Sequence, residues 1–408
     1  MLFRKKTYES SGSPSRIAWK RFKKDRLAFP ALIFIGVSVL IGILGYLITP
    51  DSTPNANDQH LEIAARKPGF SVRMLYLTKN VPVRDRSWLH TMILGRRSPY
   101  QRIPMNGYEI RADSIIIELY NEDADFKGYR QSYHLADVAF RLDPSKKIQK
   151  EGNTVVFATL DGKQHQESLE KLQNTVEEEH IRKEVFWLGT DRFGRDMLSM
   201  IMIGTRVSLS VGFIAVLISL IIGITLGAMA GFFRGWVDNL IVWFINVIWS
   251  VPTLLMVIAI TFALGKGFWQ VFVAVGLTMW VEVARVVRGQ ILSYREKDFV
   301  EAGYALGFSS IRIIGRHILP NIMGPVIVIS AANFASAILI EAGLSFLGIG
   351  VQPPVPSWGT MIKENYSYII LDAAHLAILP GMAIMLMVLA FMITGNGLRN
   401  ALDVRVKN

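Results

Sequence analysis

The chain has 408 residues, 51% of them hydrophobic, with a mean hydropathy of +0.33 and a formal net charge of +11. It is too apolar for an ordinary soluble domain and too polar for a protein made only of membrane spans, so we expect a membrane protein with one sizeable aqueous segment. It has no cysteine, which excludes disulfides and thiolate metal sites. Its basic residues cluster beside apolar runs, which is typical of membrane topology signals, so no nucleic-acid partner is expected.

The first 26 residues are polar and basic, and the apolar run Leu27–Ile48 follows them. That run is long enough to cross a hydrocarbon core of ~30 Å and is longer than the hydrophobic region of a signal peptide. We therefore predict an uncleaved membrane helix over residues 27–49, in contact with lipid. The basic flank predicts that the N-terminal segment 1–26 is cytoplasmic.

A polar segment over residues 50–188 is predicted to form a mostly β, extracytoplasmic domain inserted between the first and second membrane helices. Three β-like runs occur in it, at Ser114–Tyr120, Asp137–Leu142 and Thr154–Leu160. The last run meets Asp161-Gly162, a favoured hairpin pair. Apolar residues at helical spacing over Glu167–Lys183 predict a helix. The histidines are scattered, so no metal site is expected.

The string Leu188-Gly189-Thr190-Asp191-Arg192-Phe193-Gly194-Arg195-Asp196 follows the inserted segment. Its two glycines and alternating charges predict a turn that contains ion pairs. Two roles stay open for this turn: a structural cap on the outer end of the second span, or direct contact with a substrate.

Five further apolar runs predict membrane helices, at Val207–Phe232, Asn239–Leu264, Phe268–Val287, Ile322–Leu347 and Ala374–Ile393. The predicted fold is thus an all-α polytopic membrane protein with six transmembrane helices and one β-rich insert. Five of the helices form a core over residues 189–395. Counting from a cytoplasmic N-terminus places the loop 289–321 and the tail 396–408 in the cytoplasm. The basic residues of the short loops agree with this count.

Five residues in the predicted spans are candidates for packing or pathway roles. Gly223, Gly227 and Gly231 recur every four residues, and such a face lets two helix backbones approach closely in lipid. Pro252 interrupts a span, and kinked helices commonly line pathways, although prolines also occur for packing alone. A charge at the bilayer centre costs about 2.5–3.5 kcal/mol, so Glu341 should face the bundle interior or lie near the interface, as a packing or a pathway residue.

A polar island, Arg295–Asn321, separates two of the apolar runs. Its first half has apolar residues near helical spacing, and Gly307 breaks that pattern. The serine pair at 309–310 offers an N-cap for a second short helix over 311–317, which Pro320 is expected to stop. A helix–turn–helix held by a span at each end can receive a push from a soluble partner. The alternative is a solvated loop with helical propensity.

These strings carry a family resemblance. The island resembles the EAA loop of bacterial ATP-binding-cassette (ABC) importer permeases at Glu301, Ala302, Gly303, Gly307, Ile318, Leu319 and Pro320. The strings Leu188–Asp196, Gly343–Gly359 and Asn396–Asp403 are similar to signatures of the oligopeptide/dipeptide (and nickel) permease family, second-permease (C-type) subunit. One departure is Gly303, because alanine is usual at that position. The insert is longer than the family usually carries.

The resemblance implies an ABC type I importer-like fold in the bacterial plasma (inner) membrane, with both termini cytoplasmic. This chain would form half of the translocation pathway for peptides or similar small solutes. Alternative cargoes are nickel, glycopeptides or oligosaccharides, and the insert could instead serve mainly as an envelope-docking module.

The resemblance also implies a division of labour between subunits. A second permease subunit would complete the pathway, two ATPase subunits would dock on the EAA loop, and an extracytoplasmic solute-binding protein would deliver the cargo. The sequence has no phosphate-binding G-x-x-x-x-G-K-[ST] string. ATP would therefore be bound by the partner subunits, and this chain is expected to carry no cofactor, no metal and no enzymatic activity.

Overall fold

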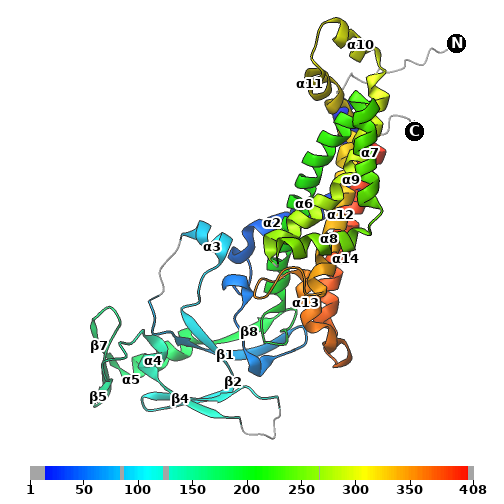
Figure 1. Cartoon of the computed structure of the whole chain (residues 1–408). Helices are drawn as coiled ribbons and strands as arrows, with labels where there is room; N and C mark the ends of the chain where they lie inside the picture. Colours follow the sequence, from blue (N-terminus) through cyan, green and yellow to red (C-terminus); the bar gives the residue numbers. More distant parts are fainter. Residues whose placement is uncertain (1–13, 83–86, 123–127, 266, 403–408) are drawn as a thin grey trace, which may run out of the picture. The chain divides into compact units, whose positions relative to one another are not determined.

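The computed structural model describes residues 14–82, 87–122, 128–265 and 267–402 (Figure 1). The predicted cytoplasmic segments 1–26 and 396–408 lie partly outside the described residues. The chain divides into two compact units. The helical unit comprises the described parts of Met1–Leu40, Val207–Gln352 and Met382–Asn408, and the β unit comprises those of Ile41–Arg206 and Pro353–Gly381. The β unit thus takes in more than the predicted insert.

Helices form the whole of the helical unit. They are α1 (Pro14–Lys24), α2 (Ala28–Leu44), α6 (Met197–Phe233), α7 (Gly235–Trp249), α8 (Thr253–Leu264), α9 (Phe268–Arg295), α10 (Asp298–Ala305), α11 (Ser310–Arg312), a π-helical turn (Ile313–Ile318), α12 (Leu319–Phe346) and α14 (His375–Leu402). Three of them, α2, α6 and α14, continue into the β unit.

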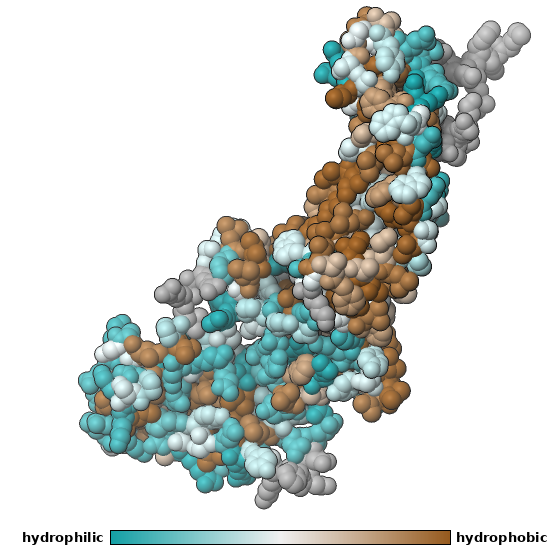
Figure 2. Space-filling view, viewed as in Figure 1, coloured by the Kyte–Doolittle hydropathy of each residue, from teal (hydrophilic) through white to brown (hydrophobic). Residues whose placement is uncertain are grey.

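Membrane-spanning character is concentrated in these helices. Within the described chain five helical stretches are long and apolar enough to cross a membrane: Ala28–Leu47, Met197–Phe233, Trp269–Arg295, Ser310–Phe346 and His375–Leu402. The bent pair α7–α8 becomes a sixth if it counts as one span. Figure 2 shows these helices covered with apolar side chains, as a lipid-facing surface requires.

One predicted span is not a single helix. The run Asn239–Leu264 forms α7 and α8, which are bent by 92° where the chain passes through Ser250, Val251 and Pro252. Proline lacks an N–H donor and disfavours helical geometry in the residue before it. The predicted kink at Pro252 is therefore a break between two short helices.

The stop expected at Pro320 is wrong. From Ser310 the chain stays helical through the π-helical turn and into α12 without interruption. Pro320 is the second residue of α12 and directly follows the π-helical turn, and such a local change in helix type accommodates a residue that lacks an N–H donor. The second helix of the predicted pair is thus the beginning of the next membrane helix.

Two antiparallel sheets build the β unit. Its strands are β1 (Phe70–Thr78), β2 (Tyr100–Arg111), β3 (Ser114–Leu119), β4 (Arg130–His134), β5 (Gln149–Glu151), β6 (Thr154–Ala158), β7 (Gln164–Ser168) and β8 (Ile181–Phe186). The larger sheet has the order β4-β3-β2-β1-β8 and the smaller one β5-β6-β7. Helices α3 (Trp88–Leu94), α4 (Leu135–Ala139), α5 (Leu169–Thr175) and α13 (Trp358–Asn365) accompany them. A core that includes Leu75, Ile117, Leu135, Val155 and Leu172 joins β1, β3, α4, β6 and α5.

The predicted elements of the insert are confirmed in part. The strands at 114–120 and 154–160 correspond to β3 and β6, and Gly162, at φ +82°, lies in the turn between β6 and β7. The strand expected over Asp137–Leu142 is wrong, because α4 covers its first residues. The helix expected over Glu167–Lys183 is wrong at both ends, where β7 and β8 pair with neighbouring strands.

A half-buried charge network joins the strands of the larger sheet. The guanidinium of Arg102 on β2 lies 2.6 Å from Asp58 and 3.1 Å from Glu184 on β8, and Tyr76 donates a hydrogen bond to Glu184. Burial would raise the pKa of Asp58, but hydrogen bonding and charge from His60 and Arg102 hold it at about 2. The ionised Asp58 carboxylate therefore stabilises the folded protein fully at pH values above its unfolded-state pKa of about 4. This stabilisation is lost as the pH falls through its folded-state pKa of about 2.

Removal of the central cation should strongly destabilise the protein. Arg102→Met removes this cation from two half-buried carboxylates, and we expect a loss of about 1–3 kcal/mol in the free energy of unfolding. The measurement is the melting temperature of the full chain in detergent. Arg111→Met is the matched control, because its pair with Glu109 is fully exposed and should change the melting temperature little. Equal melting temperatures for the two variants would contradict the assignment.

Candidate functional site

The polar island folds as α10, a tight turn and α11. Gly307 has φ +73°, its N–H donates to the Tyr304 carbonyl at 2.9 Å, and the next N–H, of Phe308, donates to the Gly303 carbonyl at 3.0 Å. These two bonds are the Schellman pattern that ends a helix on a left-handed residue. Ser309 then caps α11 by accepting a bond from the Arg312 N–H. The predicted roles of Gly307 and Ser309 in the turn are thus confirmed.

One face of the island is anchored in the helical unit. Val300, Ile313 and Ile318 are buried in a cluster to which α6, α9 and α12 contribute, with Phe232 and Ile291 among its members. The island is therefore packed on the ends of three membrane helices. A displacement of the island must move those helix ends as well, because such packed interiors deform little.

The opposite face is open. Glu301 and Ala302 are exposed on α10, and Leu306 and Ile311 expose 70% and 83% of their surface. Large apolar side chains that are this exposed are available for contact with another protein.

The remaining residues of the predicted motif divide between the two faces. Gly303 is buried, and a Cβ there would lie 3.5 Å from Ile313 Cγ1, an ordinary contact, so the alanine that is usual at this position would fit. Ile318 is buried, Leu319 is half-buried and Pro320 is exposed.

Two ion pairs at the start of α7 were not foreseen from the sequence. Arg288 on α9 contacts Asp238 on α7 through two bonds of 2.5 and 2.7 Å, and Arg234 lies 2.6 Å from Glu296, between α9 and α10. Arg234, at φ +56°, is the single residue between α6 and α7. The charges flanking the apolar runs were the available signal, but their pairing depends on the tertiary fold.

The three glycines of α6 face α9. A Cβ on Gly227 would lie 2.4 Å from the Ala284 carbonyl oxygen, and a Cβ on Gly223 or Gly231 would lie 2.8 Å from the carbonyl oxygen of residue 280 or 288. The glycines and the facing carbonyls share the same four-residue spacing. The two backbones thus approach too closely for any larger residue, which is the geometry that small-residue faces permit.

Glu341 is buried inside the helical unit. It accepts a bond from Ser345 at 2.7 Å, and Ser208 of α6 lies 3.4 Å from its other carboxylate oxygen. Ser345 in turn accepts from the Val351 N–H at 3.1 Å, so the group joins α6, α12 and the turn after α12. These contacts favour packing over the pathway among the two roles considered for Glu341.

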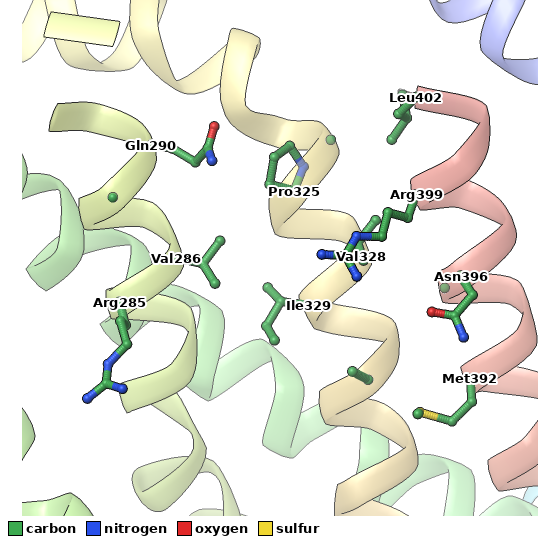
Figure 3. A pocket seen from close by; sticks show the side chains of 14 residues that line it. Arg285, Val286, Gln290, Pro325, Val328, Ile329, Met392, Asn396, Arg399 and Leu402 are labelled. Atoms are coloured by element: carbon green, nitrogen blue, oxygen red, sulfur yellow. The ribbon is translucent and has the colours of Figure 1, made fainter. Parts of the chain in front are cut away.

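A hollow of about 680 Å³ lies between α9, α12 and α14 (Figure 3). Its polar lining includes Arg285 and Gln290 from α9 and Asn396 and Arg399 from α14. In Figure 3 the side chains of Gln290 and Arg399 point toward α12, which carries Pro325 inside the helix. The size is typical of a ligand pocket, and its two arginines make it cationic.

A second hollow, of about 320 Å³, lies beside the break between α7 and α8. Trp249, Val251 and Thr253 line it on either side of Pro252, and Glu282 of α9 contributes a carboxylate. The guanidinium of Arg285 lies 3.3 Å from the ring centre of Trp249, a cation–π contact. Arg285 thus lines the first hollow and contacts a residue that lines the second.

Comparison with known proteins places two parts of the chain in described families. Residues 223–408 match the model of the "binding-protein-dependent transport system inner membrane component", and residues 13–68 match the "N-terminal TM domain of oligopeptide transport permease C". The signatures seen in the sequence lie in or between these two segments.

Individual transport permeases are similar over about half of the chain. The glutathione transport system permease protein GsiD of Pectobacterium atrosepticum is 41% identical over 222 residues, which cover 54% of this chain and 73% of the relative. The dipeptide transport system permease protein DppC of Alkalihalophilus pseudofirmus is 42% identical over 222 residues, with the same coverage. A solved structure of the MetNI methionine ABC transporter in an inward-facing conformation is similar at 16% identity and a TM-score of 0.43, over 51% of this chain and 98% of that one.

The matched families and relatives are transport permeases, not enzymes. The membrane-length apolar helices of this chain fit that class of protein. This chain is a permease subunit of an ABC importer of the inner membrane, and it belongs to the oligopeptide/dipeptide permease family of binding-protein-dependent transport systems.

Proposed function

We propose that this chain forms half of a translocation pathway for short peptides or peptide-like solutes. The functions of its relatives, dipeptide and glutathione transport, support this cargo class. The cationic hollow supports it too, because Arg285 and Arg399 complement the carboxylates that peptides carry. The break at Pro252 borders the second hollow and is the point where the pathway wall changes direction.

The proposed topology has six spans, with α7 and α8 together forming the third. The N-terminus, the loop 289–321 with the island, and the C-terminus lie in the cytoplasm, and the β-rich insert lies outside. The arginines and lysines that border the island and the N-terminal span support this orientation. A second permease subunit completes the pathway, and a solute-binding protein delivers cargo from outside.

ATPase subunits, which bind the ATP, dock on the exposed face of the island. The observation that carries this proposal is the two-faced loop: Glu301, Leu306 and Ile311 are exposed on one side, and Val300 and Ile313 are buried against three membrane helices on the other. A movement of the docked ATPase is passed to α6, α9 and α12 through the packed side. The pair Asp238–Arg288 extends this path to α7.

The turn at Gly307 provides the test. Gly307→Val places a β-branched residue at φ +73°, which costs roughly 1–2 kcal/mol and reshapes the end of α10 without a steric clash, since nothing lies within 4 Å. We expect the uptake of a labelled dipeptide to be lost while the amount of permease in the membrane is unchanged. Gly307→Asn is the matched control, because asparagine tolerates this conformation. Normal uptake with Gly307→Val would disprove the proposed coupling.

A further inference from the structure

Helix α3 of the insert carries an exposed apolar face. Trp88 exposes 65% of its surface and Ile93 56%, and Leu89 is exposed as well. At about 100° per residue, these three positions fall within an arc of about 140° on one side of the helix. Figure 2 shows apolar side chains gathered over α3 on the otherwise mostly hydrophilic β unit. Exposed apolar side chains gathered in this way mark a surface that contacts a membrane or a protein.

Arg206 fixes this helix to the end of the first membrane span. Its Nε donates to the Gly42 carbonyl at 2.7 Å and its Nη2 to the Ile43 carbonyl at 3.1 Å, both in the last turn of α2. The same guanidinium donates to the Met92 and Ile93 carbonyls at the end of α3, each at 2.7 Å. One side chain thus satisfies the free carbonyls of two helix ends, which are also their negative poles.

The position of Arg206 defines the depth of α3. The first apolar stretch, Ala28–Leu47, ends just after the carbonyls that Arg206 binds. The apolar run Val207–Phe232 begins directly after Arg206 itself. Arg206 is the one charged residue of α6, which begins at Met197, so the first span ends and the long uncharged stretch of the second begins at this guanidinium; arginines at such positions lie at the headgroup level of a bilayer. The bonds to Met92 and Ile93 hold α3 at that same level.

We propose that α3 is an interfacial helix whose apolar face lies in the boundary between lipid headgroups and acyl chains. Trp88 has the amphipathic ring that favours this boundary. Exposed Arg96 and Arg97 follow the helix, and their charge complements anionic headgroups. The occupant of the face is the lipid surface, and the insert is held to the membrane at α3 in addition to its covalent link to the spans.

The absence of native cysteine allows a direct test. Leu89→Cys and Ile93→Cys, each labelled with a nitroxide, are placed in the full chain and reconstituted into vesicles of phosphatidylethanolamine and phosphatidylglycerol. Collision rates with oxygen, which partitions into lipid, and with a water-soluble nickel chelate are then measured. Tyr129→Cys, at an exposed position of the same unit away from α3, is the control. We expect an oxygen-to-nickel ratio several-fold higher at residues 89 and 93 than at 129.

Two results would overturn the proposal. A ratio at residues 89 and 93 equal to that at 129 would show that the face lies in water. Protection from both reagents would show that protein covers it. A further variant tests the role of Arg206: in Arg206→Gln the ratio at 93 should fall toward the control value. The single-cysteine results decide the proposal even if Arg206→Gln does not fold.

Discussion

Gly227→Ala should destabilise the helical unit although it adds only one methyl group. The new Cβ would lie 2.4 Å from the Ala284 carbonyl oxygen, which is backbone and cannot rotate away. Helices α6 and α9 must separate to accept it, and overpacking of this kind costs about 1–3 kcal/mol. We expect a lower melting temperature for the detergent-purified chain, and little recovered folded protein for Gly227→Leu.

Gly36→Ala on α2 is the matched control for that experiment. It also adds a methyl group to a glycine in an apolar helix, but nothing lies within 4 Å of the added Cβ. Alanine is intrinsically better than glycine in a helix by about 0.5–1 kcal/mol, so the melting temperature should stay the same or rise. The close approach of α6 to α9 would be refuted if the Gly227→Ala and Gly36→Ala proteins melted alike.

The spans were predictable where a long apolar run is its own signal. Helices α2, α9 and α14 overlap the predicted runs because a membrane helix must satisfy its backbone bonds within one segment. The 92° bend between α7 and α8 was not predictable. A proline in an apolar run indicates that a helix is interrupted, but the angle depends on packing around the break, where Arg285 stacks on Trp249.

The insert was predictable in class but not in detail. The alternation of Asp137–Leu142 fits a strand, yet His134 caps a short helix there by accepting from the Ala136 N–H, and histidine is a rare cap. Residues 181–186 continue a helical pattern in sequence, but β1 recruits them as an antiparallel edge strand. Such pairing joins residues more than 100 positions apart, and no local pattern reports it.

In the candidate site, the residues that form the turn were predictable from the sequence. The contacts between residues far apart in the chain were not. Gly307 and Ser309 act through their own backbone neighbourhood, so their residue types indicate the turn directly. The Asp238–Arg288 pair joins elements 50 residues apart. The attachment of α3 by Arg206 spans 114 residues. Arg206 was visible in the sequence as a charge directly before an apolar run, but that position does not indicate its partners.

Ile311→Asp should abolish coupling by removing the apolar centre of the proposed docking face. Ile311 is 83% exposed, so its replacement leaves the packing of the island intact. In a complex, the carboxylate would be buried against the ATPase without a partner, and losses at such central positions reach 2 kcal/mol or more, roughly a 30-fold weaker association. We expect uptake to be lost together with the co-purification of ATPase subunits, at an unchanged level of permease in the membrane.

The comparison of two variants at this position separates docking from folding. Ile311→Leu keeps the apolar surface and should retain both uptake and co-purification, because the change preserves volume and polarity.

Gly307→Val tests a different step from Ile311→Asp. It alters the turn but keeps the exposed side chains, so ATPase subunits should still co-purify while transport fails. If Ile311→Asp retains its ATPase subunits, the docking face lies elsewhere on the island, and Glu301 with Ala302 on α10 becomes the surface to test next.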